Sequence, residues 1–159
     1  MLYFDDGGVF EGYWVNDHVN GKGRHIHHNG EYYEGDWKND MLHGSGRIVH
    51  EDGSSYDGTW KCDKQHGFGI EVWADGAVYK GDFLDGVKTG KGEFKWKDRS
   101  SYKGEFKYNK LEGVGTYTWN DGRVFKGQWS SNKMHGTGHF TWPDGRLYTG
   151  EYANDKKHG

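Results

Sequence analysis

Residues 33–55 read YEGDWKNDMLHGSGRIVHEDGSS, and copies of this stretch fill the rest of the chain. Its first glycine, in a Y-x-G-x-W motif, recurs every 23 residues at Gly12, Gly35, Gly58, Gly81, Gly104, Gly127 and Gly150. The Gly44/Gly46 pair and the Asp52-Gly53 pair recur with the same period, except that Arg99 replaces one turn glycine. Three markers that share one period without slippage indicate a tandem repeat array.

Each repeat has the pattern of one β-hairpin. Residues 33–37 alternate large apolar and polar side chains, which is typical of a half-buried strand. The polar residues 38–42 predict a hairpin loop, and residues 47–50 predict the returning strand. Residues 51–53, Glu-Asp-Gly, predict a tight turn into the next repeat, because glycine reaches positive φ and aspartate bonds its own backbone. The frequent glycines exclude helices.

Aligned copies place aromatic side chains in three columns. Two columns lie in the first strand: Phe10, Tyr33, Tyr56, Tyr79, Tyr102, Phe125 and Tyr148, then Trp14, Trp37, Trp60, Phe83, Phe106, Trp129 and Tyr152. The third, in the second strand, comprises Phe4, His27, His50, Trp73, Trp96, Trp119 and Trp142. We expect the first two columns to form the core. Because a single-layer sheet cannot bury both of its faces, some aromatic side chains should line a solvent-exposed groove.

The mid-strand glycines need a separate explanation, since glycine weakens a strand. We interpret Gly35 and its equivalents as room for a neighbouring aromatic ring that lies across the backbone. Mean hydropathy is −1.10, a value that suits disordered chains, but the periodic aromatics, 17% of the residues, argue for an ordered repeat.

The net charge of −3 is uneven. Residues 1–79 carry 6 Lys and Arg against 14 Asp and Glu, and residues 80–159 carry 15 against 10. This asymmetry suits self-association or a partner of matching charge, or is incidental to a solvated surface. A lysine-rich segment could bind anionic phospholipid through Lys80, Lys88, Lys91, Lys95, Lys97, Lys103 and Lys107, although acidic residues interleave with it. The acidic composition argues against nucleic acid.

Nothing in the sequence predicts catalysis, because residues that recur in every repeat have structural reasons to recur and no catalytic motif emerges. The histidines of the H-G-x-G motifs are expected to be structural. His25, His27 and His50 share a predicted face and could bind a metal or form a pH-sensitive contact. No carboxylate or thiolate is arranged to complete a tetrahedral site, and such histidines more often form a polar patch. No cofactor is expected.

The single cysteine, Cys62, favours a reducing, cytoplasmic compartment, and neither a signal peptide nor a transmembrane segment is evident. The chain begins and ends within a repeat. We therefore expect one continuous array over residues 1–159 that is either part of a longer protein or closed by partners, with repeats beginning near Phe10, Tyr33, Tyr56, Tyr79, Tyr102, Phe125 and Tyr148.

The pattern Y-x-G-x-W-x5-[HN]-G-x-G-x5-[DN]-G resembles the MORN (membrane occupation and recognition nexus) repeat over almost the whole chain. The resemblance implies an all-β fold: an elongated, single-layer, twisted antiparallel sheet of about six to seven stacked hairpins. It also implies scaffolds of cilia, flagella or the cell cortex that dimerise or capture a partner segment. Departures are local, with Phe83 and Phe106 in place of Trp and Arg99 in place of a turn glycine, which leaves that turn type open.

We expect a non-catalytic scaffold that binds a partner peptide or helix along a concave aromatic groove. Tyr and Trp bring large contact areas with few rotatable bonds. The predicted partner-binding residues are Trp73, Phe94, Trp96, Tyr117, Trp119, Phe140 and Trp142. Two alternatives remain open: an accessory module of a phosphoinositide kinase or lysine methyltransferase, and a module that tethers membranes through anionic phospholipid.

Overall fold

The computed structural model describes residues 2–3 and 7–158, so Met1, Phe4, Asp5, Asp6 and Gly159 lie outside the described residues. The described residues form β-strands and turns without helices, which confirms the predicted all-β fold class. The chain divides into two compact units. Unit 1 comprises residues 1–75 and 83–86, and unit 2 comprises residues 76–82 and 87–159.

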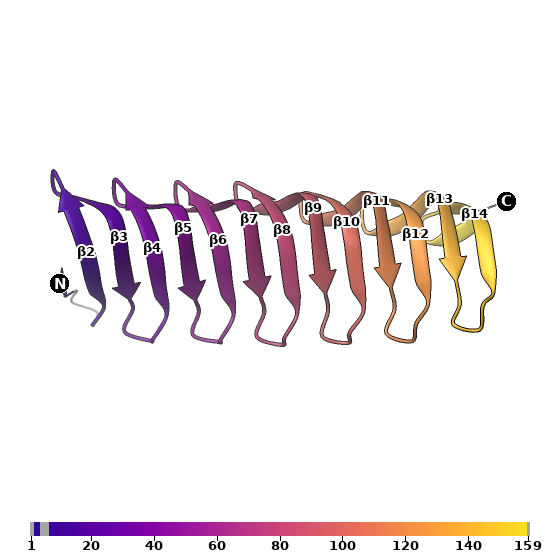
Figure 1. The fold of residues 1–159 in the computed structure, drawn as a ribbon, viewed down its shortest axis with the longest axis horizontal. Helices are drawn as coiled ribbons and strands as arrows, with labels where there is room; N and C mark the ends of the chain where they lie inside the picture. Colours follow the sequence, from indigo (N-terminus) through magenta and orange to yellow (C-terminus); the bar gives the residue numbers. More distant parts are fainter. Residues whose placement is uncertain (1, 4–6, 159) are drawn as a thin grey trace. The chain divides into compact units, whose positions relative to one another are not determined.

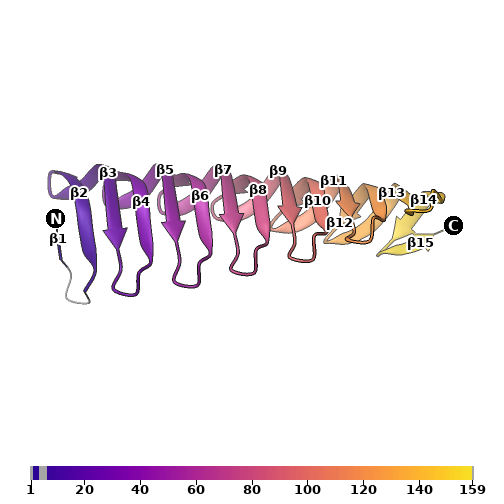
Figure 2. The same cartoon turned by 60° about the horizontal axis from the view of Figure 1, so that its bottom comes forward.

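Within each unit, antiparallel strands follow one another in chain order, and consecutive hairpins lie side by side (Figures 1 and 2). In unit 1 the strands are β1 (Leu2–Tyr3), β2 (Val9–Val15), β3 (His18–Ile26), β4 (Tyr32–Lys38), β5 (Met41–Val49), β6 (Ser55–Lys61) and β7 (Lys64–Val72). Strand β8 (Val78–Leu84) contributes residues to both units. In unit 2 the further strands are β9 (Val87–Lys95), β10 (Ser101–Lys107), β11 (Lys110–Thr118), β12 (Val124–Ser130), β13 (Lys133–Thr141), β14 (Leu147–Ala153) and β15 (Lys156–His158).

The hairpin loops are two residues long, shorter than the predicted segment of residues 38–42. Asn39 and Asp40 have φ of 49° and 68°, and Cys62 and Asp63 have φ of 48° and 67°. Two consecutive residues at positive φ define the type I′ turn, whose twist matches that of the strands it joins. Asn and Asp tolerate this conformation better than most residues, which explains their frequency in these loops.

The junctions between repeats contain a tight turn, as the sequence predicts, and five residues separate strands β5 and β6 there. In one of them the N–H of Gly53 donates to His50 O at 3.0 Å, and Gly53 has φ of 89°. Arg99 takes the same place with φ of 73°, and its N–H donates to Trp96 O at the same distance of 3.0 Å. The turn type that the sequence leaves open at Arg99 is therefore that of the other junctions, with a strained residue at the glycine position.

Each unit has an aromatic face and a polar face, because residues directly opposite in antiparallel strands share a face. Cross-strand partners on the aromatic face form one row in each unit. In unit 1 the row is Phe10, His25, Tyr33, Ile48, Tyr56 and Glu71. In unit 2 the row is Phe94, Tyr102, Tyr117, Phe125, Phe140 and Tyr148.

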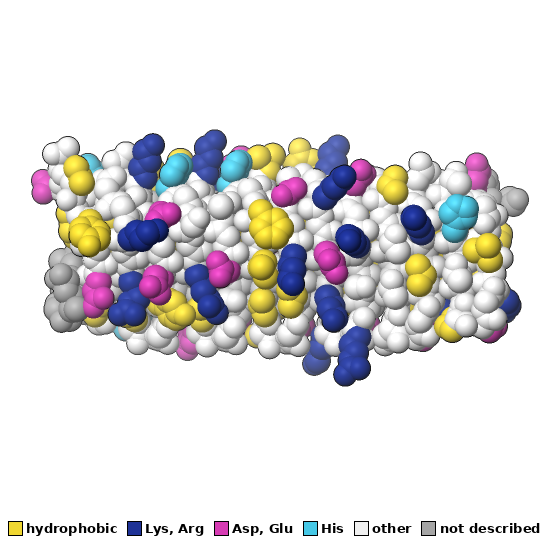
Figure 3. Space-filling view, viewed as in Figure 1, with side chains coloured by type: hydrophobic (Ala, Val, Ile, Leu, Met, Phe, Trp, Pro, Cys, Tyr) yellow, Lys and Arg dark blue, Asp and Glu magenta, His cyan; other side chains and the backbone are white. Residues whose placement is uncertain are grey.

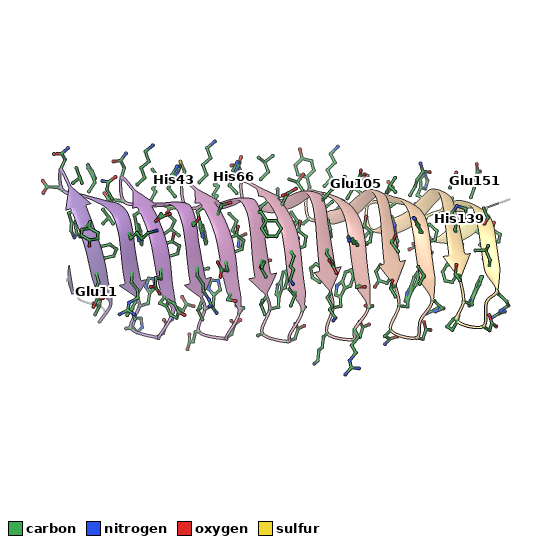
Figure 4. The ribbon with its side chains drawn as sticks, viewed as in Figure 1. Glu11, His43, His66, Glu105, His139 and Glu151 are labelled. Atoms are coloured by element: carbon green, nitrogen blue, oxygen red, sulfur yellow. The ribbon has the colours of Figure 1, made fainter. Side chains whose placement is uncertain are left out.

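The polar face carries charges of both signs in register. In unit 1, Glu11, Arg24, Glu34, Arg47 and Asp57 are successive cross-strand partners. Figure 3 shows this face, with Lys and Arg side chains beside Asp and Glu, and Figure 4 labels Glu11, Glu105 and His139 on it. Opposite charges on neighbouring strands keep the face solvated and contribute at most about 1 kcal/mol per pair.

The core consists of the two predicted strand-one columns. Tyr33, Tyr56, Tyr79, Tyr102 and Phe125 are buried, and their rings meet the second column edge to face. Tyr56, for example, lies 5.0 Å from Trp60 and 5.2 Å from Phe83, with interplanar angles of 81° and 86°. Such pairs contribute about 0.5–1.5 kcal/mol each beyond burial. Trp14, the first member of the second column, is 48% exposed and departs from this prediction.

The mid-strand glycines make room for these rings, as the sequence suggests. A Cβ atom on Gly92 would lie 2.5 Å from the hydroxyl oxygen of Tyr79 and 2.6 Å from its ring. The facing Gly81 is equally crowded, with its Cβ position 2.6 Å from the same hydroxyl. The tyrosine ring therefore lies directly across a pair of glycines, and that contact completes the core of each hairpin.

Candidate functional site

Six rings on the aromatic face of unit 2 touch one another in a continuous series, here called the aromatic ladder. Its members are Phe94, Trp96, Tyr117, Trp119, Phe140 and Trp142. Successive ring centroids are 4.5, 5.2, 4.6, 5.2 and 4.5 Å apart, and the planes are tilted by 34° to 51°. These distances place every neighbouring pair in ring contact.

The ladder has two rows that belong to different parts of the hairpins. Phe94, Tyr117 and Phe140 lie within β9, β11 and β13, where they face Tyr102, Phe125 and Tyr148 on the next strand. Tyr102 and Phe125 are fully buried, and Tyr148 is half-buried. Trp96, Trp119 and Trp142 follow two residues later, where the chain leaves the strand for the junction turn. Phe140 is 8% exposed, whereas the other five rings are half-buried. The ladder is thus anchored on the core and offers aromatic surface to solvent.

Two arginines cover the junction-turn end of the ladder. The guanidinium of Arg123 lies 5.2 Å from the ring centre of Trp119, and that of Arg146 lies 5.2 Å from the ring centre of Trp142. Cation–π contacts of this kind contribute about 0.5–1 kcal/mol at exposed sites. Each arginine is held by the aspartate two residues earlier: Arg123 Nε lies 2.8 Å from Asp121 Oδ2, and Arg146 Nε lies 2.8 Å from Asp144 Oδ2.

Two aspartates of the junction turns beside the ladder, Asp98 and Asp121, carry depressed pKa values. The backbone N–H of Arg123, with help from its guanidinium, holds the pKa of Asp121 below its usual range. At the preceding junction, hydrogen bonds from the hydroxyl and N–H of Ser100 lower the pKa of Asp98. Ser100 is buried, and Tyr117 donates its hydroxyl to Ser100 Oγ at 3.4 Å. The hydrogen bonds of the turns thus keep Asp98 and Asp121 ionised and hold them beside the ladder.

Of the seven predicted partner-binding residues, the structure brings six together in the ladder. The seventh, Trp73, belongs to unit 1 and is half-buried there. It borders a small hollow of about 70 Å³ with His50, Tyr56 and Glu71. The positions that carry the ladder's strand row in unit 2 hold His25, Ile48 and Glu71 in unit 1. The strand row is therefore aromatic in unit 2 and mixed in unit 1.

The lysines predicted to bind phospholipid do not gather into a patch of one sign. Lys91 faces Glu105 across the strands, and Lys103 faces Glu93. Lys88 lies elsewhere, with its Nζ 5.4 Å from the ring centre of Tyr79 on the aromatic face. Phospholipid binding by Lys80, Lys88, Lys91, Lys95, Lys97, Lys103 and Lys107 stays a prediction that this geometry does not strengthen.

The three histidines predicted as metal ligands lie in unit 1. The rings of His25 and His27 are 4.2 Å apart, and His50 Nδ1 lies 3.9 Å from Glu31 Oε1. Across residues 2–3 and 7–158, no group of three or more His, Cys, Asp or Glu side chains is placed to hold a metal ion. The metal site and the pH-sensitive contact both remain predictions. His43 and His66, of the H-G-x-G motifs, occupy matching places near the hairpin loops (Figure 4).

Sequence reasoning missed the arginines that cover the ladder. A signal was available, because Trp119 to Arg123 and Trp142 to Arg146 share the pattern W-x-D-G-R, which the other repeats lack. As for membranes, the described part of the chain contains no helix long and apolar enough to cross one.

A family model described as the MORN repeat matches residues 10–32, 33–55, 56–78, 79–101, 102–122, 125–145 and 148–159. A search of curated protein sequences finds no match to the chain. Among solved structures, the chain is similar to the TCP domain of SAS-4 (dCPAP) of Drosophila melanogaster, determined in complex with a proline-rich motif of Ana2 (dSTIL). The identity is 12%, the TM-score is 0.56, and the alignment covers 94% of this chain and 81% of that one.

A second structure is the TCP10 domain of Danio rerio CPAP, in complex with a peptide of Danio rerio STIL. It is 15% identical over 92% of this chain and 75% of that chain, with a TM-score of 0.36. At these identities the first likeness concerns the fold alone, and the second is too distant to support an argument.

Proposed function

Because the chain belongs to the MORN repeat family, we propose that it is a non-catalytic interaction array for a partner protein. The binding site in this proposal is the aromatic ladder of unit 2, which takes a peptide segment of the partner. A cytoplasmic, cytoskeletal setting such as a cilium, a flagellum or the cell cortex is the setting that the family suggests, and it forms part of the proposal.

The observation that carries the proposal is the half-burial of a continuous series of rings. A side chain needed only for the core would be buried, as Tyr79, Tyr102 and Phe125 are. Trp96, Tyr117 and Trp119 instead keep part of their ring surface in solvent while their neighbours hold them in place. Rigid, partly exposed Trp and Tyr are the side chains most enriched at binding hot spots. The fold likeness to a domain that binds a proline-rich motif adds support for a peptide as the bound segment.

The proposal is tested by selecting peptides from a displayed library on the wild-type protein. The affinity of a selected peptide is then compared between wild type and the double variant Trp96→Ala/Trp119→Ala. The control is Tyr108→Ala, which removes an aromatic side chain that is 71% exposed in a hairpin loop of unit 2. Circular dichroism establishes that each variant folds.

We expect the double variant to bind at least roughly tenfold more weakly, since one hot-spot side chain contributes about 2 kcal/mol. The control should bind as wild type does. Equal affinities of wild type and a folded double variant would show that the ladder is only part of the core.

A further inference from the structure

The tryptophan row of the ladder has a measurable repeat distance. Trp96 and Trp119 both touch Tyr117, at 5.2 and 4.6 Å, so their ring centres are at most about 9.8 Å apart. Trp119 and Trp142 both touch Phe140, at 5.2 and 4.5 Å, which limits their separation to about 9.7 Å. Two strand spacings of a β-sheet give about 9.4–9.8 Å, in agreement with these limits. The ring contacts thus limit the repeat of the row to about 9.8 Å, and the spacing of β-strands places it near 9.6 Å.

A polyproline II helix has nearly the same repeat. It contains three residues per turn with a rise of about 3.1 Å per residue, so equivalent side chains return every ~9.3 Å. Over the two steps from Trp96 to Trp142, the mismatch amounts to only about 0.6 Å. One proline at every third position can thus meet each tryptophan in turn.

The other regular conformations fit less well. In an α-helix, side chains return to one face after seven residues, or about 10.5 Å, which leaves a mismatch of roughly 1.8 Å over two steps. In an extended strand, residues three apart lie about 10 Å apart but point to opposite faces. Only the polyproline II helix combines the right face with the right distance.

The chemistry of the ladder suits the same conformation. Aromatic-lined surfaces are the usual partners of proline-rich helices, because proline rings pack against flat faces and the preformed helix loses little entropy. A polyproline II backbone also leaves its carbonyl groups without internal partners. The guanidinium groups of Arg123 and Arg146 lie 5.2 Å from the ring centres of Trp119 and Trp142, so they bring N–H donors for such carbonyls close to the row.

We propose that the aromatic ladder binds a proline-rich segment in the polyproline II conformation, of the pattern P-x-x-P-x-x-P, with one turn of peptide per hairpin. The peptide axis runs across the strands, and its prolines contact Trp96, Trp119 and Trp142. This inference rests on the proposed function and specifies the chemistry and spacing of its ligand.

The test uses synthetic, labelled peptides on the full chain. The first peptide is P-x-x-P-x-x-P with alanine and serine at x, and its control is P-x-P-x-x-x-P, which has the same composition and length but a broken period. A four-residue P-x-x-P peptide spans a single step. Fluorescence anisotropy gives the affinities for wild type, Trp96→Ala and Tyr108→Ala, with circular dichroism as the check of folding.

We expect the periodic peptide to bind wild type about tenfold more tightly than its broken-period control and than P-x-x-P. In Trp96→Ala the advantage of the longer peptide should disappear, because only two tryptophans of the row remain. Tyr108→Ala should behave as wild type. Equal binding of the periodic and broken-period peptides overturns the inference.

The two proposals can fail separately. If library-selected peptides depend on Trp96 and Trp119 but show no three-residue proline period, the inference is wrong and the proposed function stands. If neither selected nor synthetic peptides depend on the ladder, both are wrong.

Discussion

At the scale of single residues, the buried tyrosines combine a ring that packs and a hydroxyl that bonds. The Tyr56 hydroxyl donates to Thr59 O at 2.9 Å, and Tyr79 and Tyr102 make the same bond to the residue three positions on. Burial raises the pKa of Tyr56 to about 12, and it also raises the pKa of Tyr33 and Tyr102. Phe10 and Phe125 occupy equivalent positions, so the ring fits without the hydroxyl.

These shifts predict a loss of stability at alkaline pH. Between pH 10 and 12 the Tyr56 hydroxyl ionises in the unfolded chain but stays protonated in the fold. The unfolded state then binds fewer protons, and the free energy of unfolding falls as the pH rises above 10. In Tyr56→Phe this contribution is absent, so the alkaline decline should be shallower. At pH 7 the variant should lose about 1 kcal/mol with the hydrogen bond.

Urea unfolding at several pH values between 7 and 11 measures both effects. Tyr13→Phe is the matched control, because Tyr13 is 70% exposed and its removal should leave the profile unchanged. If the free energy of unfolding fell equally steeply with pH in wild type and Tyr56→Phe, ionisation of Tyr56 would not be a cause of the alkaline decline.

At the scale of elements, hairpin loops are joined to the preceding hairpin by a reciprocal pair of hydrogen bonds. Asn132 accepts the N–H of Leu111 through Oδ1 at 2.8 Å and donates its own N–H to Leu111 O at 3.0 Å. Asp40, Asp63, Asn109 and Asp155 make the same two contacts with the preceding hairpin. The second residue of each loop thus links its own hairpin to the one before.

Substitutions of Asn132 distinguish the contribution of its side-chain hydrogen bond from that of its positive-φ turn conformation. Asn132→Gly keeps the positive φ of 70° but removes the side-chain acceptor, as in the natural loop at Gly86. Because Leu111 is buried, its N–H loses a partner, and we expect a loss of about 1–2 kcal/mol in the free energy of unfolding. Asn132→Asp retains an oxygen and should remain within about 0.5 kcal/mol of wild type. Chemical denaturation measures both, and equal stabilities of the two variants would refute the role of the acceptor.

Much of each hairpin could be predicted from the sequence, because its determinants are local or periodic. The glycine pairs predicted a ring across the backbone, and Gly92 shows that contact with Tyr79. The bonds of Asn132 to the preceding hairpin could not be predicted, because their partner, Leu111, lies 21 residues away at the start of β11. The arginine above Trp119 depends on a side-chain rotamer, and no periodic pattern specifies it.

The two-unit division was also not predictable, because the 23-residue period crosses it unbroken. The sequence does show that equivalent positions of the two units carry different side chains. Phe94, Tyr117 and Phe140 are aromatic where unit 1 has histidine, isoleucine and glutamate. The alignment of the repeats therefore predicts which residues form the ladder, whereas the contacts between their rings are known only from the structure.

At the scale of the whole molecule, the two units differ strongly in charge. Unit 1 carries 6 Lys and Arg against 15 Asp and Glu, a net charge of −9. Unit 2 carries 15 against 9, a net charge of +6, and it is the unit that holds the aromatic ladder. A positively charged binding unit attracts acidic ligands over about a Debye length and raises their rate of association.

The charge of unit 2 therefore predicts which proline-rich segments bind fastest. A P-x-x-P-x-x-P peptide with glutamate at x should associate roughly tenfold faster at low salt than the same peptide with lysine. Stopped-flow tryptophan fluorescence measures the rates, and a serine peptide should lie between them. The difference should shrink as salt screens the charges, because it arises from the field of the unit and not from the ring contacts. A lysine peptide that associates as fast as the glutamate peptide at low salt would show that the aspartates beside Trp119 and Trp142 cancel that field at the ladder.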